Sequence, residues 1–224
     1  MPRETNAHKR ERALKIEQRM CEHYPAAECA LRYWDDPFRL TIAVMLSAQT
    51  TDAGVNKVTP ALWERYPTIA DLAQADPADV ARIISTIGCF KVKSKHAVGI
   101  AQMIMADFGG QVPPDMNDLQ KLPGVGRKTA NIVLNEGFGI VEGIAVDTHV
   151  NRIAHRLKLV PKDDDPSKTE RALLKLYPRE MWGPINHQWV LFGRQTCIAR
   201  RPKCAECFLG DLCPSCSCDN GPHA

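Results

Sequence analysis

The stretch LPGVGRKTANIVLNEGFGIVEGIAVDT, residues 122–148, contains the pattern that decides the fold. It opens with a glycine-punctuated turn, LPGVG, at residues 122–126. A helix-forming segment follows, and a short helix is also expected just before the turn, over residues 115–121. Two helices joined by a Gly-Val-Gly turn make a helix–hairpin–helix candidate.

The glycine turn has the features of a site that binds a nucleic-acid backbone. Gly124 and Gly126 allow positive φ and close approach of a ligand to the backbone, with Val125 between them. The N–H groups at the start of the next helix suit a phosphate, and Arg127 and Lys128 add positive charge there. The alternative is an ordinary tight turn between two packed helices, which also needs glycine.

Lys128 and Asp147 are the candidate catalytic residues of this stretch. Lys128 falls in the first turn of its helix, where the positive end of the helix dipole disfavours a second positive charge. Only a neutral amine attacks carbon, so this position suits a lysine nucleophile. Asp147 has the position of a helix N-cap, which keeps a carboxylate ionised and able to stabilise positive charge on a sugar ring. The alternatives are a solvated lysine and a purely structural cap.

Four cysteines near the end of the chain have metal-ligand spacing. Cys197, Cys204, Cys207 and Cys213 follow the pattern C-x6-C-x2-C-x5-C. Four thiolates from one short segment suit either an iron–sulfur cluster or a tetrahedral zinc ion, and ligand type alone leaves both open. Two further cysteines, Cys216 and Cys218, follow as spare thiols or alternative fourth ligands. Three earlier ones are expected to pack as small apolar side chains: Cys21, Cys29 and Cys89.

The segment between the first two of these ligands, IARRPK, is basic. Arg200, Arg201 and Lys203 lie between two fixed cysteines, and Arg194 lies just before them. A basic loop fixed at both ends by a metal site suits a phosphate clamp, and the alternative is a solvated loop.

The remaining segments predict an all-α fold, because turn and cap signals alternate with helical patterns and strand alternation is scarce. Pro37 to Ser47 is apolar on nearly every face, so a buried helix is expected and a buried strand is the alternative. Pro60 is expected to kink a helix over 52–66 or to start a new one capped by Thr59. The other expected helices cover residues 9–24, 77–85, 93–108, 127–136, 147–159 with Asp147 as cap, 166 onward with a possible Ser167–Glu170 capping box, and 185–200.

Size and composition fit a globular protein of one or two domains. The chain has 224 residues, 44% of them hydrophobic, with a net charge of +3 and a pI near 8.4, which permit an anionic partner without requiring one. Residues 1–15 are charged and lack the apolar core of a secretory signal, and no apolar run reaches membrane-spanning length. A cytoplasmic, nucleoid-associated protein is therefore expected, in which nine cysteines indicate metal rather than disulfides.

Taken together, these motifs resemble the endonuclease III family of DNA base-excision glycosylases, part of the helix–hairpin–helix superfamily. The resemblance covers nearly the whole chain and rests on LPGVGRKTAN (122–131), AVDTHVNR (145–152), MLSAQTTD (45–52), STIG (85–88) and GRQTCIARRPKC (193–204). It implies a helix–hairpin–helix glycosylase fold with a six-helix barrel domain at 30–140. A discontinuous cluster domain would combine 1–29 with 141–224 and carry a four-iron four-sulfur cluster.

The resemblance also implies residue roles. Lys128 would attack the anomeric carbon of a flipped nucleotide, and the Schiff base formed would permit β-elimination, with Asp147 assisting. The substrates would be oxidised pyrimidines and abasic sites in duplex DNA, bound by a monomer. Gln49 would fill the space that the flipped base leaves. Cys89 stands where the family usually carries a leucine wedge, so weaker flipping or an altered damage preference is expected.

Two other functions are compatible with parts of the pattern. The adenine-removing, mismatch-directed branch of the superfamily shares the turn, the aspartate and the cluster. It lacks the nucleophilic lysine and carries an extra C-terminal domain, whereas this chain has Lys128 and only eleven residues after Cys213. A non-catalytic DNA-binding or redox-sensing module is the other alternative, and the pairing of Lys128 with Asp147 argues against it.

Overall fold

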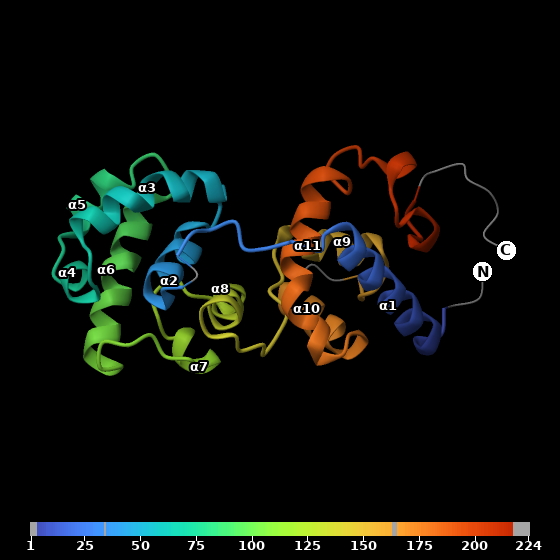
Figure 1. The fold of residues 1–224 in the computed structure, drawn as a ribbon, viewed down its shortest axis with the longest axis horizontal. Coiled ribbons are helices and arrows are strands. Elements are labelled where there is room, and N and C mark those ends of the chain that lie inside the picture. The colour runs from blue at the N-terminus through green and yellow to red at the C-terminus, as the bar shows by residue number, and fades with distance from the viewer. Residues whose placement is uncertain (1–3, 34, 163–164, 217–224) are drawn as a thin grey trace. The chain divides into compact units, whose positions relative to one another are not determined.

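The computed structural model describes residues 4–33, 35–162 and 165–216, and every regular element within those ranges is helical (Figure 1). The all-α prediction is therefore confirmed. The chain forms two compact units. One combines the described residues up to Glu28 with those from Gly143 onward, and the other is Cys29–Glu142.

The unit from Cys29 to Glu142 consists of short helices with polar caps. Side chains of Asp36, Thr51, Thr68, Asp76 and Asp115 each accept an N–H bond at a helix start, as N-cap residues do. The elements are α2 (Pro37–Leu46), α3 (Asp52–Arg65), α4 (Ile69–Ala73), α5 (Pro77–Ile83), α6 (Phe90–Asp107), α7 (Met116–Leu119), α8 (Arg127–Ile132) and the π-helical η1 (Val133–Gly137).

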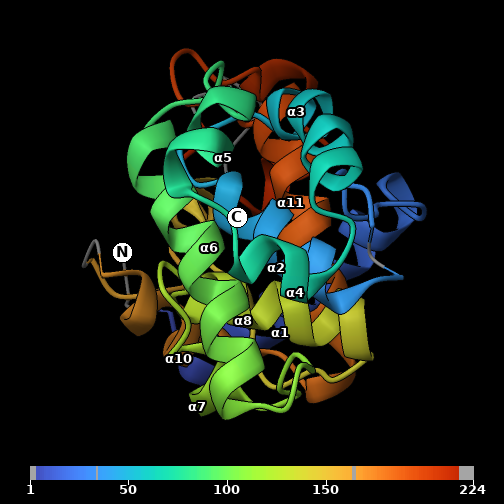
Figure 2. The ribbon, with the colours of Figure 1, turned by 90° about the vertical axis from the view of Figure 1, so that its left-hand side faces the viewer.

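Helix α2 lies at the centre of this unit. Almost all its side chains are buried, which explains why its sequence is apolar on nearly every face. Gly137 lies against it so closely that an added Cβ would be 3.3 Å from a methyl carbon of Leu40. The long helix α6 packs beside α4 and α5, as Figure 2 shows. The segment 37–47 is thus a buried helix and not a strand.

Three details of the expected helices in this unit are settled by the structure. Helix α3 continues through Pro60, so of the two alternatives the new start capped by Thr59 is wrong, and Thr59 is a buried residue inside the helix. Helix α6 begins at Phe90, three residues before the expected start, because Cys89 turns the chain with a φ of 58°. The helix after the glycine turn changes from α to π geometry at Val133.

The second unit is built around one apolar core. Ile16 and Met20 pack with Val150, Ile153 and the aromatic rings of Tyr177 and Trp189, which lie edge to face 6.4 Å apart. Its elements are α1 (Asn6–His23), α9 (Thr148–Arg156), α10 (Pro166–Leu176), η2 (Arg179–Met181), α11 (Trp182–Gln195), η3 (Cys204–Glu206) and η4 (Gly210–Leu212).

Helix α1 is tied to the cysteine-rich end of the chain, although the two are almost 200 residues apart. Arg19 donates to the carbonyl of Phe208 at 2.8 Å and pairs with the carboxylate of Asp211 at 2.9 Å. Arg12 donates to the carbonyls of Leu157 and Leu212 at 2.8 and 3.1 Å. These bonds explain why an N-terminal helix belongs to the same unit as the C-terminal cysteines.

Two further boundary predictions needed correction in this unit. The N-cap of α10 is Asp165, which accepts from the Ser167 N–H, so the proposed capping box starting at Ser167 was wrong. Helix α11 ends at Gln195 rather than near residue 200, because the chain must turn to present its cysteines. None of the described helices is long and apolar enough to cross a membrane.

Candidate functional site

The glycine turn adopts a conformation that requires glycine at its centre. Gly124 has a φ of +73°, and a Cβ added to it would lie 2.4 Å from Nδ1 of His96, so no side chain fits there. Val125 is 4% exposed and its N–H donates to the carbonyl of Leu122 at 3.1 Å. Val125 therefore fixes the turn from inside, and neither its side chain nor its N–H is directed at a ligand. Gly126 is the exposed N-cap of α8.

Lys128 occupies the second position of α8, directly after this turn. It is half-buried, whereas Arg127 before it is exposed. The π-helical turn η1 begins five residues later, and such turns are frequent at functional sites because they interrupt the regular helix. The turn, the lysine and the π-helical segment thus follow one another within residues 122–137.

Gln49 and Cys89 lie at the tips of two loops of the same unit. Both are exposed, and both have left-handed backbone, with φ of 54° and 58°. Non-glycine residues in this conformation carry strain and concentrate at functional sites. The loops are adjacent, since a Cβ added to Gly88 would lie 3.6 Å from the carbonyl oxygen of Gln49.

A buried lysine connects these two loops. Lys93 is only 5% exposed, and its Nζ donates to Oγ1 of Thr50 at 2.8 Å. Burial lowers the pKa of Lys93, while the neighbouring Cys89 raises it to a lesser extent. Thr50, directly after Gln49, is therefore held by α6, the helix that begins directly after Cys89.

Asp147 is the N-cap of α9, as predicted. One oxygen, Oδ1, accepts from the backbone N–H groups of His149 and Val150, each at 2.8 Å. The other oxygen, Oδ2, has no hydrogen-bond or ion-pair partner among the described residues of its own unit. The cap thus orients the carboxylate and leaves one oxygen for a ligand.

Beyond Asp147, α9 carries three polar side chains toward α11 and the cysteine loop. Arg152 donates to the carbonyls of Gly193 and Cys197, both at 3.1 Å. His149 lies so close to Gly193 that a Cβ there would be 2.6 Å from its Nδ1. Burial lowers the pKa of His149, against the opposing effect of Asp147.

Arg156, in the last turn of α9, holds the cysteine loop. Its guanidinium donates to the sulfur of Cys197 at 3.2 Å and to the carbonyls of Ile198 and Ala199 at 2.7 and 2.8 Å. One nine-residue helix therefore connects the Asp147 cap to the first cysteine of the metal motif. At about 1.5 Å per residue, that connection is about 14 Å long.

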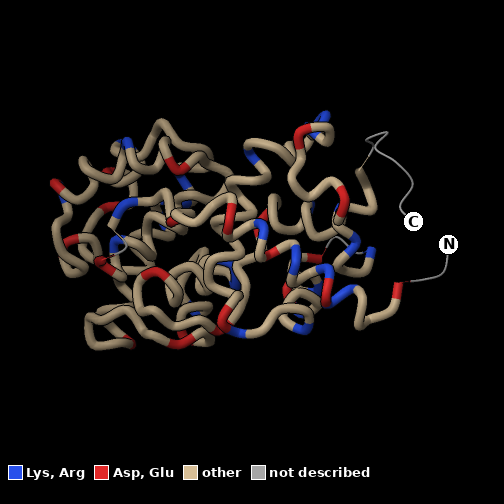
Figure 3. The backbone as a smooth tube through the Cα atoms, turned by 45° about the vertical axis from the view of Figure 1, so that its right-hand side comes forward, with Lys and Arg blue, Asp and Glu red and all other residues tan. Residues whose placement is uncertain are grey.

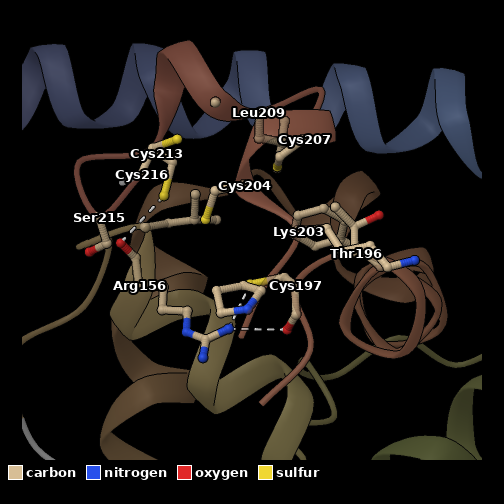
Figure 4. A pocket seen from close by; sticks show the side chains of 14 residues that line it. Arg156, Thr196, Cys197, Lys203, Cys204, Cys207, Leu209, Cys213, Ser215 and Cys216 are labelled. Atoms are coloured by element: carbon tan, nitrogen blue, oxygen red, sulfur yellow. Dashed lines mark hydrogen bonds between the residues drawn. The ribbon is translucent and has the colours of Figure 1, made fainter. Parts of the chain in front are cut away.

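The four motif cysteines surround one pocket. The sulfurs of Cys197, Cys204, Cys207 and Cys213 line a space of about 510 Å³, counted with its open mouth, and Figure 4 shows them around it. Within the described part of the chain, no three His, Cys, Asp or Glu side chains converge on a point as ligands of a single ion do. Four thiols that line one pocket are the ligand set of an iron–sulfur cluster.

Burial shapes the chemistry of this pocket. It raises the pKa of the Cys207 thiol to about 11 and also raises that of Cys213. Such thiols bind as thiolates only when a metal displaces their protons, so cluster binding and release of protons are coupled.

The basic loop leaves the pocket on its outer side. Arg200, Arg201 and Lys203 are all exposed, and Arg201 has a φ of 55°. The loop is closed by the Lys203 N–H, which donates to the carbonyl of Thr196 at 3.0 Å. Arg194 is exposed on the last turn of α11. Elsewhere along the chain, positive side chains are interspersed with negative ones (Figure 3). The positive charge of the basic loop is therefore a local feature.

Sequence reasoning did not find Lys93, Arg152 or Arg156. Lys93 lies in the segment KVKSK, where a surface lysine is the ordinary expectation, and nothing in the pattern shows that it is buried. Arg152 and Arg156 are spaced four residues apart on α9, so they share a face. That spacing was a usable signal, but the carbonyls that they bind become partners only in the folded chain.

The family of the chain follows from comparison with known proteins. Residues 42–179 match the model of the HhH-GPD superfamily base excision DNA repair proteins, and residues 197–213 match the iron-sulfur binding domain of endonuclease III. Endonuclease III of Synechocystis sp. is 46% identical over 93% of this chain and 94% of its own length. Endonuclease III of Escherichia coli K12 is 40% identical over 89% and 93%.

Solved structures agree with this assignment. A trapped endonuclease III–DNA covalent intermediate has a TM-score of 0.87 at 40% identity, covering 92% of this chain and 96% of that one. A thermostable thymine-DNA glycosylase has a TM-score of 0.78 at 22% identity, over 92% and 96%, and shows the shared fold alone. This chain has the helix–hairpin–helix glycosylase fold and belongs to the endonuclease III family. It is a base-excision DNA glycosylase and AP lyase with a four-iron four-sulfur cluster.

Proposed function

We propose that Lys128 is the nucleophile of this enzyme and that Asp147 is its electrostatic partner. The observation that carries the proposal is the carboxylate of Asp147, with Oδ1 fixed by two backbone N–H groups and Oδ2 left open. A carboxylate held in this way keeps its orientation without reorganisation during the reaction. Lys128, half-buried at the start of α8, provides the amine.

The proposed reaction proceeds in two stages. The neutral Nζ of Lys128 attacks C1′ of a flipped nucleotide, a C–N bond to the lysine forms, and the bond to the base breaks. The base leaves with a proton, the lysine nitrogen loses one, and the sugar opens to a Schiff base. Loss of a proton from C2′ then expels the 3′ phosphate by β-elimination. Asp147 stabilises positive charge on the sugar or helps to deprotonate Lys128.

DNA is the partner of the endonuclease III structures to which this chain is similar. For this chain we propose that Gly124 and Gly126, with Arg127, bind phosphates through backbone groups and charge, while Val125 supports the turn from inside. Arg194, Arg200, Arg201 and Lys203 are proposed as the second set of phosphate contacts. The bond between the base and C1′ is inaccessible inside the base stack, so the nucleotide must be flipped out of the duplex. Gln49 and Cys89 are proposed to enter the duplex where the base is flipped.

The proposed substrates are oxidised pyrimidines and abasic sites in duplex DNA, bound by one copy of the chain at the nucleoid. Borohydride trapping tests this directly. The intact protein, with a duplex that contains thymine glycol, is expected to give a covalent protein–DNA adduct after reduction. Lys128→Ala should give none, because the Schiff base needs its amine. The matched control is Lys121→Ala, an exposed lysine just before the same turn, which should trap like the parent.

The Asp147 role has its own outcome in the same experiment. Asp147→Asn keeps an oxygen that accepts the N–H bonds of the cap but loses the charge, so α9 should remain folded while trapping slows by orders of magnitude. The proposal is wrong if the intact protein gives no adduct with several oxidised pyrimidines and abasic sites, or if Lys128→Ala still gives one.

A further inference from the structure

Cys216 is a fifth thiol in the wall of the cluster pocket. It is half-buried and lines the same space as the four motif cysteines. Figure 4 shows it beside Cys213 in the wall of the pocket. The iron–sulfur motif itself covers residues 197–213 and ends before it. The sequence pattern therefore leaves Cys216 without a role, although its sulfur lies where ligands are needed.

The backbone presents Cys216 in the same way as a motif ligand. Cys204 and Cys207 form a C-x2-C turn in which the Cys207 N–H donates to the Cys204 carbonyl at 3.1 Å. Cys213 and Cys216 form a second C-x2-C turn, and the Cys216 N–H donates to the Cys213 carbonyl at 3.0 Å. This spacing recurs in metal sites because the turn directs two thiols to one side.

The position of the sulfur supports a ligand rather than a surface thiol. A Cβ added to Gly210 would lie 3.8 Å from Sγ of Cys216 and 4.0 Å from the carbonyl oxygen of Cys204. The Cys216 sulfur thus lies over Gly210, and Cys216 is an electrostatic neighbour of Cys213. Cys197 is held elsewhere on the wall by Arg156. The ligand that Cys216 can replace is therefore its neighbour Cys213.

We propose that Cys216 is a reserve ligand of the iron–sulfur cluster that takes the place of Cys213 when Cys213 is lost or released. In this exchange the iron–sulfur bond to Cys213 is replaced by one to Cys216. Cys216 gives its thiol proton to solvent and the released Cys213 thiolate takes one up, so no electron is transferred. The other three ligands keep their positions.

Cluster content in cysteine variants of the full chain tests the proposal. Cys213→Ala should retain at least half of the parent's iron and acid-labile sulfide per chain. The double variant Cys213→Ala, Cys216→Ala should lose almost all of it. Cys213→Ala combined with Cys218→Ala should behave like Cys213→Ala alone, which assigns the rescue to Cys216. Cys207→Ala is the matched control and should lose the cluster, because no spare thiol follows Cys207 in a comparable turn.

Alkylation of the folded proteins gives a second readout that does not depend on activity. With iodoacetamide and mass spectrometry, Cys216 should be modified in the parent and protected in Cys213→Ala that retains iron. If Cys213→Ala does not fold, the single variant Cys216→Ala decides, and it should lose iron to a chelator faster than the parent. Loss of the cluster from Cys213→Ala as complete as from Cys207→Ala would overturn the proposal. Modification of Cys216 in iron-containing Cys213→Ala, or equal rates of iron loss from Cys216→Ala and the parent, would also overturn it.

Discussion

At the scale of single residues, several side chains of this enzyme combine a structural and a chemical task. Asp147 caps α9 with one oxygen, and within the described residues of its own unit the other oxygen has no hydrogen bond. Gly124 is required by its φ of +73° and by the closeness of His96. Asp147 is a helix cap and Gly124 is part of a tight turn, as a purely structural interpretation predicts. The same geometry explains why each residue suits a functional site.

Cys89 stands at the position where the resemblance to the family implies a leucine wedge, and replacing it gives a direct prediction. A leucine covers more apolar surface than a cysteine, so Cys89→Leu should fill an opened duplex better and raise the single-turnover rate several-fold. The backbone strain is unchanged, because both residues have a Cβ at a φ of 58°. Val92→Leu, which adds bulk at an exposed neighbouring site, should have no such effect. The wedge interpretation is wrong if Cys89→Leu alters neither the rate nor the ranking of lesions.

Glu17 predicts a pH dependence of stability. It is completely buried, its Oε2 accepts from Nε1 of Trp189 at 3.0 Å, and burial raises its pKa from 4.5 to about 7. Between these pH values the folded state holds a proton that the unfolded state has lost, so the free energy of unfolding falls as pH rises through this window. The loss attributable to Glu17 is at most about 3 kcal/mol and is complete above the folded pKa.

Urea unfolding from pH 5.5 to 8.5 measures this effect. Glu17→Gln cannot ionise, so its stability relative to the parent should increase steadily up to about pH 7 and then level off. Glu22→Gln, an exposed carboxylate on the same helix, is the control and should track the parent. A stability difference between Glu17→Gln and the parent that does not vary with pH would refute the buried-charge explanation.

At the scale of elements, local signals in the sequence were sufficient where the cause was local. Asp-Pro pairs predicted the starts of α5 and α10, and the apolar run at 37–47 predicted the buried helix α2. The errors arose where distant contacts decide. Pro60 remains inside α3, and Lys93 is buried by a loop 43 residues away. The C-x6-C-x2-C-x5-C spacing predicted the metal site, whereas Arg156 binds it through folded geometry alone.

The bond between Lys93 and Thr50 predicts coupling of the two proposed wedge loops. Lys93→Met keeps the buried stem and removes the donor, and Thr50→Val removes the acceptor at nearly constant shape. Each should slow single-turnover base removal and lower the free energy of unfolding by about 1.5–3 kcal/mol, the contribution of a hydrogen bond to a charged group. The double variant should be no slower than the worse single variant, because both remove one interaction. Additive effects in this double-mutant cycle would exclude the coupling.

At the scale of the whole molecule, the proposed contacts to DNA are divided between the two units. The glycine turn with Arg127 belongs to Cys29–Glu142, and the basic loop belongs to the unit that holds the cluster. Cluster ligands on both sides of the loop, with Arg156 beneath it, give that loop a fixed shape. The cluster is thus expected to act on DNA binding by shaping this loop.

Salt dependence of DNA binding tests whether both units contact phosphates. The logarithm of affinity should fall with the logarithm of salt concentration, with a slope that loses about 0.9 for each phosphate contact removed. Arg127→Ala should therefore lower the slope by about one, and Arg200→Ala, Arg201→Ala and Lys203→Ala together by up to about three. The two changes should add, because the residues lie in separate units. Arg65→Ala, at the end of α3 and outside both proposed contact sets, is the control. An affinity that stays flat between low and physiological salt would exclude the phosphate contacts, and a combined variant with the slope of one set alone would restrict binding to one unit.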